Sequence, residues 1–159
     1  MWFKEEIDKI KQYKVKEKEI FQLISLSNLL FENLADLFLK KHNVTLVQFR
    51  ILEFIYNEKK PVSQIELSRK FNVNRANITG IIDRLEKNNF VKRQGFEKDK
   101  RKKIVFLTDK SKKLISTIQP EFNEFIISIF KGNFNKDELK MFEFLHKKLI
   151  EILKKTVYS

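Results

Sequence analysis

The chain has 159 residues, of which 42% are hydrophobic and 13% aromatic, a composition typical of one folded domain with a sizeable core. Its formal net charge is +12 and it has no cysteine, which excludes disulfides, thiolate metal ligands, cysteine nucleophiles and thiol-based redox sensing. No apolar run approaches the roughly 18 residues that a membrane span needs, and the first residues lack the features of a signal peptide, so we expect a cytoplasmic protein.

Periodicity and capping signals predict a mainly α-helical chain with one small β-hairpin. Apolar residues at helical spacing indicate the helices, and two short segments rich in β-branched and aromatic residues indicate the strands. In chain order, the predicted elements are helices at about 17–41, 46–57, 64–70 and 75–88, strands at 91–94 and 103–107, and helices at about 109–131 and 136–156. The helix starts are marked by capping boxes at Thr45 with Gln48, Ser63 with Glu66 and Asn135 with Glu138, and by a cap at Asn74. One domain, residues 1–159, is expected.

The segment from 64 to 107 carries the outline of a winged helix-turn-helix. Its two helices are joined by the short turn Phe71-Asn72-Val73, in which Asn72 can adopt the left-handed conformation. In the second helix the apolar side chains fall within one arc of the helical wheel, so this face is expected to pack inward. A hairpin with a strongly basic tip follows, in the position of a wing.

Gly80 lies in the middle of the second of these helices, on the face opposite the apolar arc. Glycine costs up to about 1 kcal/mol relative to alanine inside a helix, so its presence needs a reason. A bare position here would let the helix backbone approach the major groove of DNA closely. Packing of Gly80 against a neighbouring element is the alternative explanation.

Basic side chains are concentrated in the same segment. Residues 61–108 hold 12 basic and 5 acidic side chains, and five of the six arginines fall between 69 and 101. An AT-rich coding sequence would also raise the lysine content, but it does not explain clustered arginines. Arginine reads guanine with two hydrogen bonds, grips phosphate and enters narrow minor grooves. The charge distribution therefore favours nucleic acid as the partner.

Three sequence segments together carry a family resemblance. They are LVQFRILEFI, QIELSRKFNVNRANITGIIDRLEKNNFVKR and DKRKKIVFLTDKSKKL, and the last holds an aspartate and an arginine two residues apart, Asp99 and Arg101. These segments resemble the DNA-binding core of MarR-family transcriptional regulators over residues 44 to about 115. Asn72 stands where the family commonly has glycine in the turn, and Lys100 stands where arginine is common in the wing. The resemblance implies a winged helix-turn-helix domain flanked by N- and C-terminal dimerisation helices.

The family's mode of binding implies a role for each matching position. The start of the second helix, residues 74–79, is expected to read the major groove. Arg101 is expected to enter the minor groove, oriented by Asp99, while Ser63 and Gln64 lie at a helix N-terminus suited to phosphate. The complete set of expected DNA-binding residues is Ser63, Gln64, Asn74, Arg75, Asn77, Thr79, Arg84, Arg93, Asp99, Lys100, Arg101 and Lys102.

Two of these arginines have a second explanation. Arg84 and Arg93 are equally suited to contact phosphate or to pair within the chain with Asp83 and Glu86. Both pairings satisfy the charge and donors of arginine. The sequence leaves the two alternatives open.

The flanking helices are expected to join two copies of the chain. Residues 1–43 and 109–159 are interpreted as dimerisation helices around a DNA-binding region at 44–108. The last helix presents apolar residues at spacings of three and four, at Phe142, Leu145, Leu149 and Ile152. A homodimer predicts a pseudo-palindromic operator in double-stranded DNA, with half-sites about one helical turn apart. The family resemblance further implies a repressor that a small aromatic or anionic effector releases, with phenylalanines such as Phe31, Phe38 and Phe49 available for a pocket or for the core.

Other classes of function are poorly supported by the sequence. The three glycines cannot form a phosphate-cradling loop, and no catalytic motif is present, so no enzyme and no cofactor is expected. The two histidines, His42 and His146, are interpreted as solvated side chains, and no metal site is expected. A membrane-surface helix over residues 7–21 is disfavoured by its acidic residues. The alternative that stays open is a winged-helix module that binds another protein and no DNA.

Overall fold

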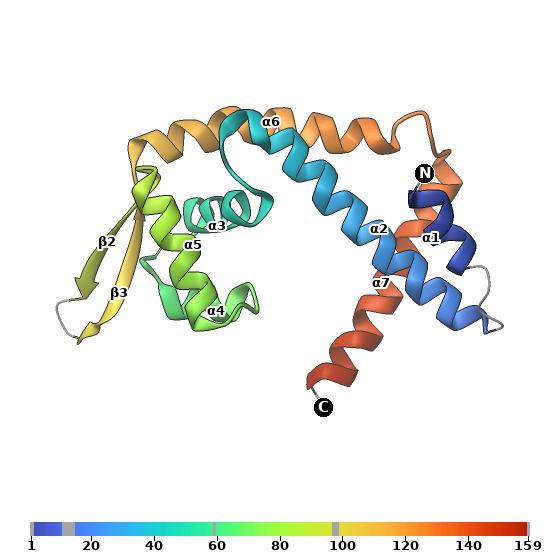
Figure 1. Cartoon of the computed structure of the whole chain (residues 1–159), viewed down its shortest axis with the longest axis horizontal. Helices are drawn as coiled ribbons and strands as arrows, with labels where there is room; N and C mark the ends of the chain where they lie inside the picture. Colours follow the sequence, from blue (N-terminus) through green and yellow to red (C-terminus); the bar gives the residue numbers. More distant parts are fainter. Residues whose placement is uncertain (1, 11–14, 59, 97–98, 159) are drawn as a thin grey trace. The chain divides into compact units, whose positions relative to one another are not determined.

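The computed structural model describes residues 2–10, 15–58, 60–96 and 99–158, and for residues 2–4, 96, 99–102 and 158 it describes the backbone only. Figure 1 shows the elements in chain order. They are α1 (Trp2–Ile10), α2 (Lys16–Leu39), the 3-10 helix η1 (Lys40–His42), α3 (Leu46–Asn57), β1 (Val62–Ser63), α4 (Gln64–Lys70), α5 (Arg75–Lys87), β2 (Val91–Phe96), β3 (Asp99–Leu107), α6 (Asp109–Phe130) and α7 (Lys136–Tyr158). The mainly α fold with a small hairpin is thereby confirmed.

The chain divides into two compact units, Met1–Ser116 and Thr117–Ser159, and the division falls inside α6. The first unit contains the helix-turn-helix, the sheet and α1 to α3, and the second contains the rest of α6 with α7. The expected division into dimerisation helices around a winged region at 44–108 stays a prediction. Within the described ranges, no helix is long and apolar enough to cross a membrane.

All four predicted caps are present, because each follows from a short-range hydrogen bond. Thr45 and Ser63 each head a complete capping box. Asn135 accepts from the backbone N–H of Glu138 at 3.0 Å, and Glu138 accepts from the backbone N–H of Asn135 at 2.8 Å. Reciprocal bonds of this kind satisfy donors that a helix start would otherwise leave unpaired. The helix starts are therefore set by residues within four positions of one another.

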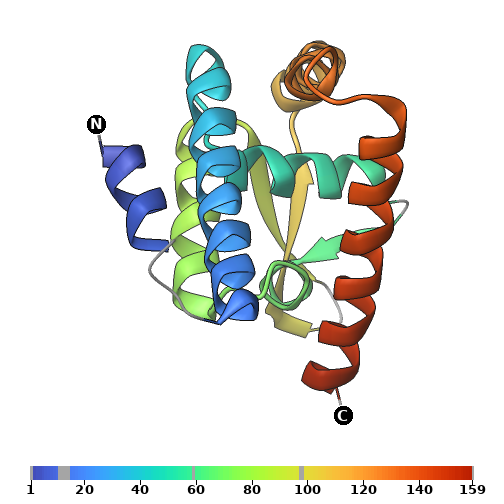
Figure 2. The same cartoon turned by 90° about the vertical axis from the view of Figure 1, so that its right-hand side faces the viewer.

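The sheet contains one strand that the sequence pattern does not indicate. Its strand order is β1–β3–β2, and β1 pairs antiparallel with β3 through Val62 with Val105 and Ser63 with Ile104 (Figure 2). A strand of two residues is too short to show the alternation of a strand. β1 covers the edge of the hairpin, which would otherwise leave backbone donors and acceptors unpaired.

The hairpin and the N-terminus also differ from the predicted boundaries. β3 begins at Asp99 and not at Lys103, because Asp99 pairs with Phe96 of β2 across a register shift that the sequence pattern does not indicate. α1 is a separate amphipathic helix that ends at Ile10, and α2 begins at Lys16, so residues 7–10 and 16–21 belong to two different helices.

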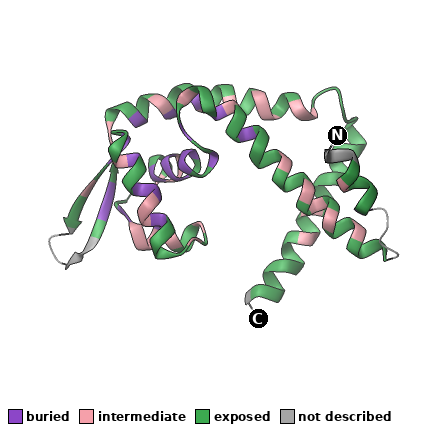
Figure 3. Ribbon diagram, viewed as in Figure 1, coloured by how far each residue is buried: buried purple, intermediate pink, exposed green. Residues whose placement is uncertain are grey.

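The core of the first unit lies between α3, α4, α5 and the sheet. Figure 3 shows buried residues gathered on these elements. Side chains that are fully buried include Phe49, Leu52, Leu67, Ile78, Ile82, Leu85 and Val91. Burial of each such side chain contributes roughly 1.5–3 kcal/mol, so the helix-turn-helix and the sheet are held as one body.

Candidate nucleic-acid interface

The turn between α4 and α5 fixes the angle at which α5 leaves the core. Asn72 has a φ of 49°, in the left-handed region, as expected for an asparagine in place of the usual glycine. The hydroxyl of Ser68 donates to the carbonyl oxygen of Val73 at 2.6 Å, and the N–H of Val73 donates back to the carbonyl of Ser68 at 3.0 Å. These two bonds close the turn, so α5 starts at a defined position beside α4.

The inward face of α5 is apolar and buried, as the helical wheel predicts. Ile78, Ile82 and Leu85 are fully buried, and Ile81 is nearly so. The opposite face carries Gly80, which has no neighbouring atom within 4 Å of the place where a Cβ would stand. Packing of Gly80 on another described part of the chain is therefore excluded as its explanation. The outward face of α5 is open for another molecule.

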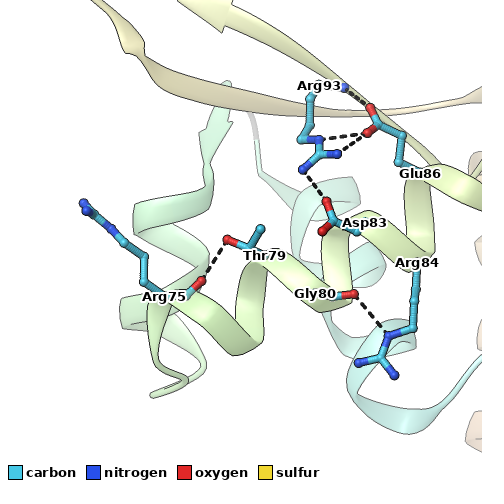
Figure 4. Close-up of polar contacts among 7 residues, drawn as sticks. All are labelled: Arg75, Thr79, Gly80, Asp83, Arg84, Glu86 and Arg93. Carbon is cyan, nitrogen blue, oxygen red and sulfur yellow. Dashed lines mark hydrogen bonds and ion pairs between the residues drawn. The ribbon is translucent and has the colours of Figure 1, made fainter.

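The start of α5 presents polar side chains to solvent. Arg75 is exposed and points away from the helix (Figure 4), and within the described residues its guanidinium has no partner. Asn77 is also exposed, and its side-chain amide makes no bond to another described residue. Asn74 differs, because its side-chain oxygen accepts from the N–H of Asn77 at 2.8 Å to cap the helix. Asn77 therefore keeps both an acceptor and a donor, whereas Asn74 uses its acceptor in the cap.

The hydroxyl of Thr79 is used inside the helix. It donates to the carbonyl oxygen of Arg75 at 2.8 Å (Figure 4). Thr79 can still accept a hydrogen bond or offer its methyl group to a base.

Ser63 and Gln64, the expected phosphate contacts at the start of α4, differ in their surroundings. Ser63 is buried, and its hydroxyl donates to Glu66 Oε2 at 2.8 Å and accepts from the N–H of Glu66 at 3.2 Å. The hydroxyl of Ser63 thus caps α4, which disfavours the expected phosphate contact, and that contact stays a prediction. The side-chain nitrogen of Gln64 is shielded from solvent without a hydrogen-bond partner among the described residues. A buried unpaired donor costs about 1–3 kcal/mol, so Gln64 gains from any acceptor that reaches it.

The two arginines with open alternatives are used differently. Arg84 is exposed, and its Nε donates to the carbonyl oxygen of Gly80 at 3.1 Å, which leaves the outer guanidinium nitrogens for another molecule. Arg93 is half-buried and pairs with Asp83 and Glu86 (Figure 4). The structure therefore favours the intramolecular alternative for Arg93 and not for Arg84.

The pairing of Arg93 changes the acid-base properties of its partner. The guanidinium of Arg93 donates to the carboxylate of Glu86, which holds the pKa of Glu86 below its ordinary value of 4.5. The same hydrogen bond raises the pKa of Arg93. Each group stabilises the charged form of the other, so both stay charged at neutral pH.

The expected wing residues lie in β3. Asp99, Lys100, Arg101 and Lys102 form its first four positions, and their side chains lie outside the described part of the structure. β2 and β3 pair antiparallel from Val91 with Leu107 outward, with a register shift between Gly95 and Phe96. The two strands form the wing that the sequence predicts, next to α5 in the same unit.

Apolar side chains on α7 are exposed in the single chain. Phe142, Leu145 and Ile152 are between 42% and 53% exposed, and Leu149 is half-buried. The sequence pattern did not single out Met141, Phe144, Leu153 and Val157, which are also exposed. Met141 and Leu153 lie four residues from Leu145 and Leu149, so helical spacing places both beside the stripe. The exposed apolar surface of α7 is thus wider than the four residues named from the sequence.

A link between α2 and α3 also escapes the sequence pattern. The carboxylate of Asp36, in α2, accepts from the backbone N–H of Leu46, at the start of α3, at 2.5 Å. This bond joins residues ten positions apart, whereas capping signals are read within four positions. Asp36 thereby ties the long helix α2 to the first helix of the winged region.

Residues 44–103 match the model of the MarR family. The HTH-type transcriptional regulator PapX of Escherichia coli is 29% identical over 139 residues, which cover 87% of this chain and 84% of PapX. The HTH-type transcriptional regulator MgrA of Staphylococcus aureus is 26% identical over 146 residues, which cover 91% of this chain and 96% of MgrA.

Solved structures agree with these relatives. A mutant MarR from Escherichia coli, complexed with operator DNA, superposes with a TM-score of 0.72 at 25% identity, covering 82% of this chain and 92% of that protein. The family model matches residues 44–103, which hold the helix-turn-helix and most of the wing, where the sequence segments resemble the family. The chain belongs to the MarR family of winged helix-turn-helix transcriptional regulators, and it is not an enzyme.

Proposed function

We propose that the chain binds a pseudo-palindromic duplex as a homodimer and represses transcription until a small ligand releases it. One observation carries the DNA-binding part of this proposal. The inward face of α5 is buried in the core, while its outward face is open and bordered by exposed polar side chains. A helix with this division, beside a wing whose tip is basic in sequence, fits a major groove with the adjacent minor groove. The DNA complex of the related MarR supports the same assignment.

The contacts follow from which side-chain atoms are unoccupied. Asn77 has both an oxygen and an amide available, as bidentate recognition of adenine requires. Arg75 extends from the first turn of α5 and suits guanine or phosphate. Arg84 offers its outer guanidinium nitrogens to phosphate. Gln64 is proposed for phosphate because of its position at the N-terminus of α4. Arg101, oriented by Asp99, is proposed for the minor groove.

The proposed homodimer is supported by the apolar surface of α7. Monomeric soluble proteins rarely expose contiguous apolar patches of large area. A second copy would cover this surface by a two-fold contact, in which the same residues face one another. Two copies of α5 would then read two half-sites about one helical turn apart.

The proposed effector site is a cavity at the junction of α2 and α3. Its volume is about 540 Å³, and its lining includes Asn33, Asp36, Lys40, Asn43, Thr45 and Gln48. Lys40 and the side-chain amides suit an anionic or polar ligand. A ligand there would lie against Asp36, whose carboxylate links α2 to α3. Phe49 is part of the core, so it does not serve as a pocket wall by itself.

DNA binding is tested by selection of duplexes from a random-sequence library with the purified protein, followed by titration at several salt concentrations. We expect a palindromic consensus and an affinity that falls steeply with salt, because each neutralised phosphate releases counterions. A protein that recovers no consensus and shows no salt-dependent binding would instead be the winged-helix protein-interaction module. Repression is tested with a reporter gene downstream of the selected duplex.

A further inference from the structure

Arg93 connects the first strand of the wing to the recognition helix through four hydrogen bonds. Its backbone N–H donates to Glu86 Oε1 at 3.0 Å, and its Nε donates to Glu86 Oε2 at 2.8 Å. Nη1 donates to Asp83 Oδ1 at 2.6 Å, and Nη2 donates to Glu86 Oε2 (Figure 4). The backbone and all three guanidinium nitrogens of Arg93 are thus directed at α5.

The chain reverses between α5 and β2, which brings Arg93 back alongside the helix. Asn89, in the turn, has a φ of 58°, and the N–H of Phe90 donates to the carbonyl oxygen of Leu85 at 2.8 Å. Phe90 and Val91 are buried, so the core holds the beginning of β2. Arg93 adds a polar attachment farther along the strand, toward the tip of the wing.

The bonds of Arg93 are better suited to fix the direction of β2 relative to α5 than to stabilise the fold. The side chains of Asp83, Glu86 and Arg93 are 52%, 35% and 20% exposed, and ion pairs near the surface contribute little to the free energy of unfolding. The guanidinium is planar, however, and its donors have fixed directions. Because β3 is hydrogen-bonded to β2 along the hairpin, the direction of β2 is also the direction of the wing.

We propose that Asp83 and Glu86 hold Arg93 as a strut that sets the orientation of the wing relative to α5. The strut aligns the two elements so that α5 and Arg101 enter adjacent grooves of one duplex. Arg93 is then a positioning residue and not a phosphate contact. This inference rests on the proposed DNA-binding function and assigns an active role to two acidic residues beside a surface that binds a polyanion.

The direction in which Glu86→Gln changes DNA affinity distinguishes the strut from simple electrostatic attraction. Glu86→Gln removes a negative charge near the DNA, so electrostatic attraction alone would tighten binding. The strut requires the carboxylate, so its loss should weaken binding. Arg93→Lys distinguishes the strut from a phosphate contact. It keeps the charge that a phosphate contact needs but loses the planar fork that the strut needs.

The experiment measures the affinity of full-length variants for the duplex that the wild-type protein selects from a random-sequence library, and for a scrambled duplex. We expect Glu86→Gln and Arg93→Lys each to weaken binding to the selected duplex by about tenfold, and to change binding to the scrambled duplex by less than about twofold. Asp109→Asn is the matched control, since Asp109 is a fully exposed acid that pairs only with Lys112 among the described residues. Thermal unfolding of each variant checks that the fold is retained.

A double-mutant cycle with Arg101→Ala tests whether the strut acts through the wing. If it does, Glu86→Gln should cost less than about twofold once Arg101 is absent, because coupled residues are not additive. Equal or tighter binding by Glu86→Gln, or full additivity with Arg101→Ala, would overturn the strut while leaving DNA binding intact. A wild-type protein that selects no duplex would overturn the proposed function, and the role of the strut with it.

Discussion

The winged region and α7 differ in how far their apolar side chains are buried. Between α3 and β3 the large apolar residues are mostly buried, whereas α7 exposes Phe142, Phe144, Leu145 and Leu153 (Figure 3). A segment that buries its own apolar face is stabilised within one chain. A helix that leaves such a face exposed needs a further surface to cover it. The comparison separates a part of the molecule that is complete in itself from a part that is suited to assembly.

The largest expected effect is the loss of core packing in the winged region. Leu85→Ala should lower the free energy of unfolding by about 2–5 kcal/mol, because Leu85 is fully buried and its removal leaves a cavity. Urea denaturation measures this loss. Tyr56→Ala, at an exposed position on α3, is the control and should change stability by less than about 0.5 kcal/mol. Equal losses in the two variants would contradict the described core.

The second prediction concerns the exposed face of α7. Leu145→Glu should shift the protein from dimer toward monomer by a factor of 30 or more, about 2 kcal/mol, because a charge would be buried in an apolar contact. Light scattering over a range of protein concentrations measures the shift. Lys148→Glu, which also adds negative charge to α7, should leave the dimer nearly unchanged. An unaltered dimer in Leu145→Glu would place the interface elsewhere.

The third prediction tests the proposed contact of the wing with the minor groove. Arg101→Ala should weaken binding to the selected duplex by about tenfold or more, since a specific groove contact contributes about 1–3 kcal/mol. Urea denaturation should show an unchanged free energy of unfolding. Lys103→Ala removes a neighbouring charge and should have a smaller effect that is alike on all duplexes. Unchanged affinity in Arg101→Ala would show that the wing assignment is wrong.

A smaller effect is expected from the cap of α4. Ser63→Ala should lower the free energy of unfolding by about 1 kcal/mol, the usual cost of losing an N-cap. Its affinity for DNA should stay the same at temperatures where both proteins are folded, because the hydroxyl is engaged with Glu66. Gln64→Ala should show the opposite pattern, with weaker DNA binding and little change in stability. Weaker DNA binding by Ser63→Ala would show that Ser63 contacts phosphate, as the family resemblance implies.

The smallest effect is a dependence of stability on acid pH. The backbone N–H and hydroxyl of Ser63 donate to Glu66 and hold its pKa below its ordinary value of 4.5. A carboxyl with a lowered pKa contributes stability that is complete above the unfolded value and is lost as the pH falls through the folded value. The temperature of thermal unfolding should therefore fall as the pH drops below about 4.5. Glu66→Gln should reduce that slope, and an identical slope would contradict the assignment.

Most elements of the winged region could be predicted because their signals are local. The helices at 46–57 and 64–70 begin and end where the caps and the turn residues predict, since a cap depends on side chains three positions apart. Asn72 takes the left-handed conformation for the same reason, because its preference is carried by one residue. The buried face of α5 follows from helical spacing alone.

By itself, the sequence determined the main helices and the hairpin in their order, the buried face of α5 and the family to which the chain belongs. Only the tertiary structure decided which partners polar groups take beyond the local caps. Arg93 pairs with Glu86 because the chain reversal returns β2 to α5, and Asp36 reaches Leu46 because α2 packs near the start of α3. β1 exists only because the edge of β3 lies beside it. Each of these contacts joins residues that are brought together by packing, and no spacing along the chain encodes such a distance.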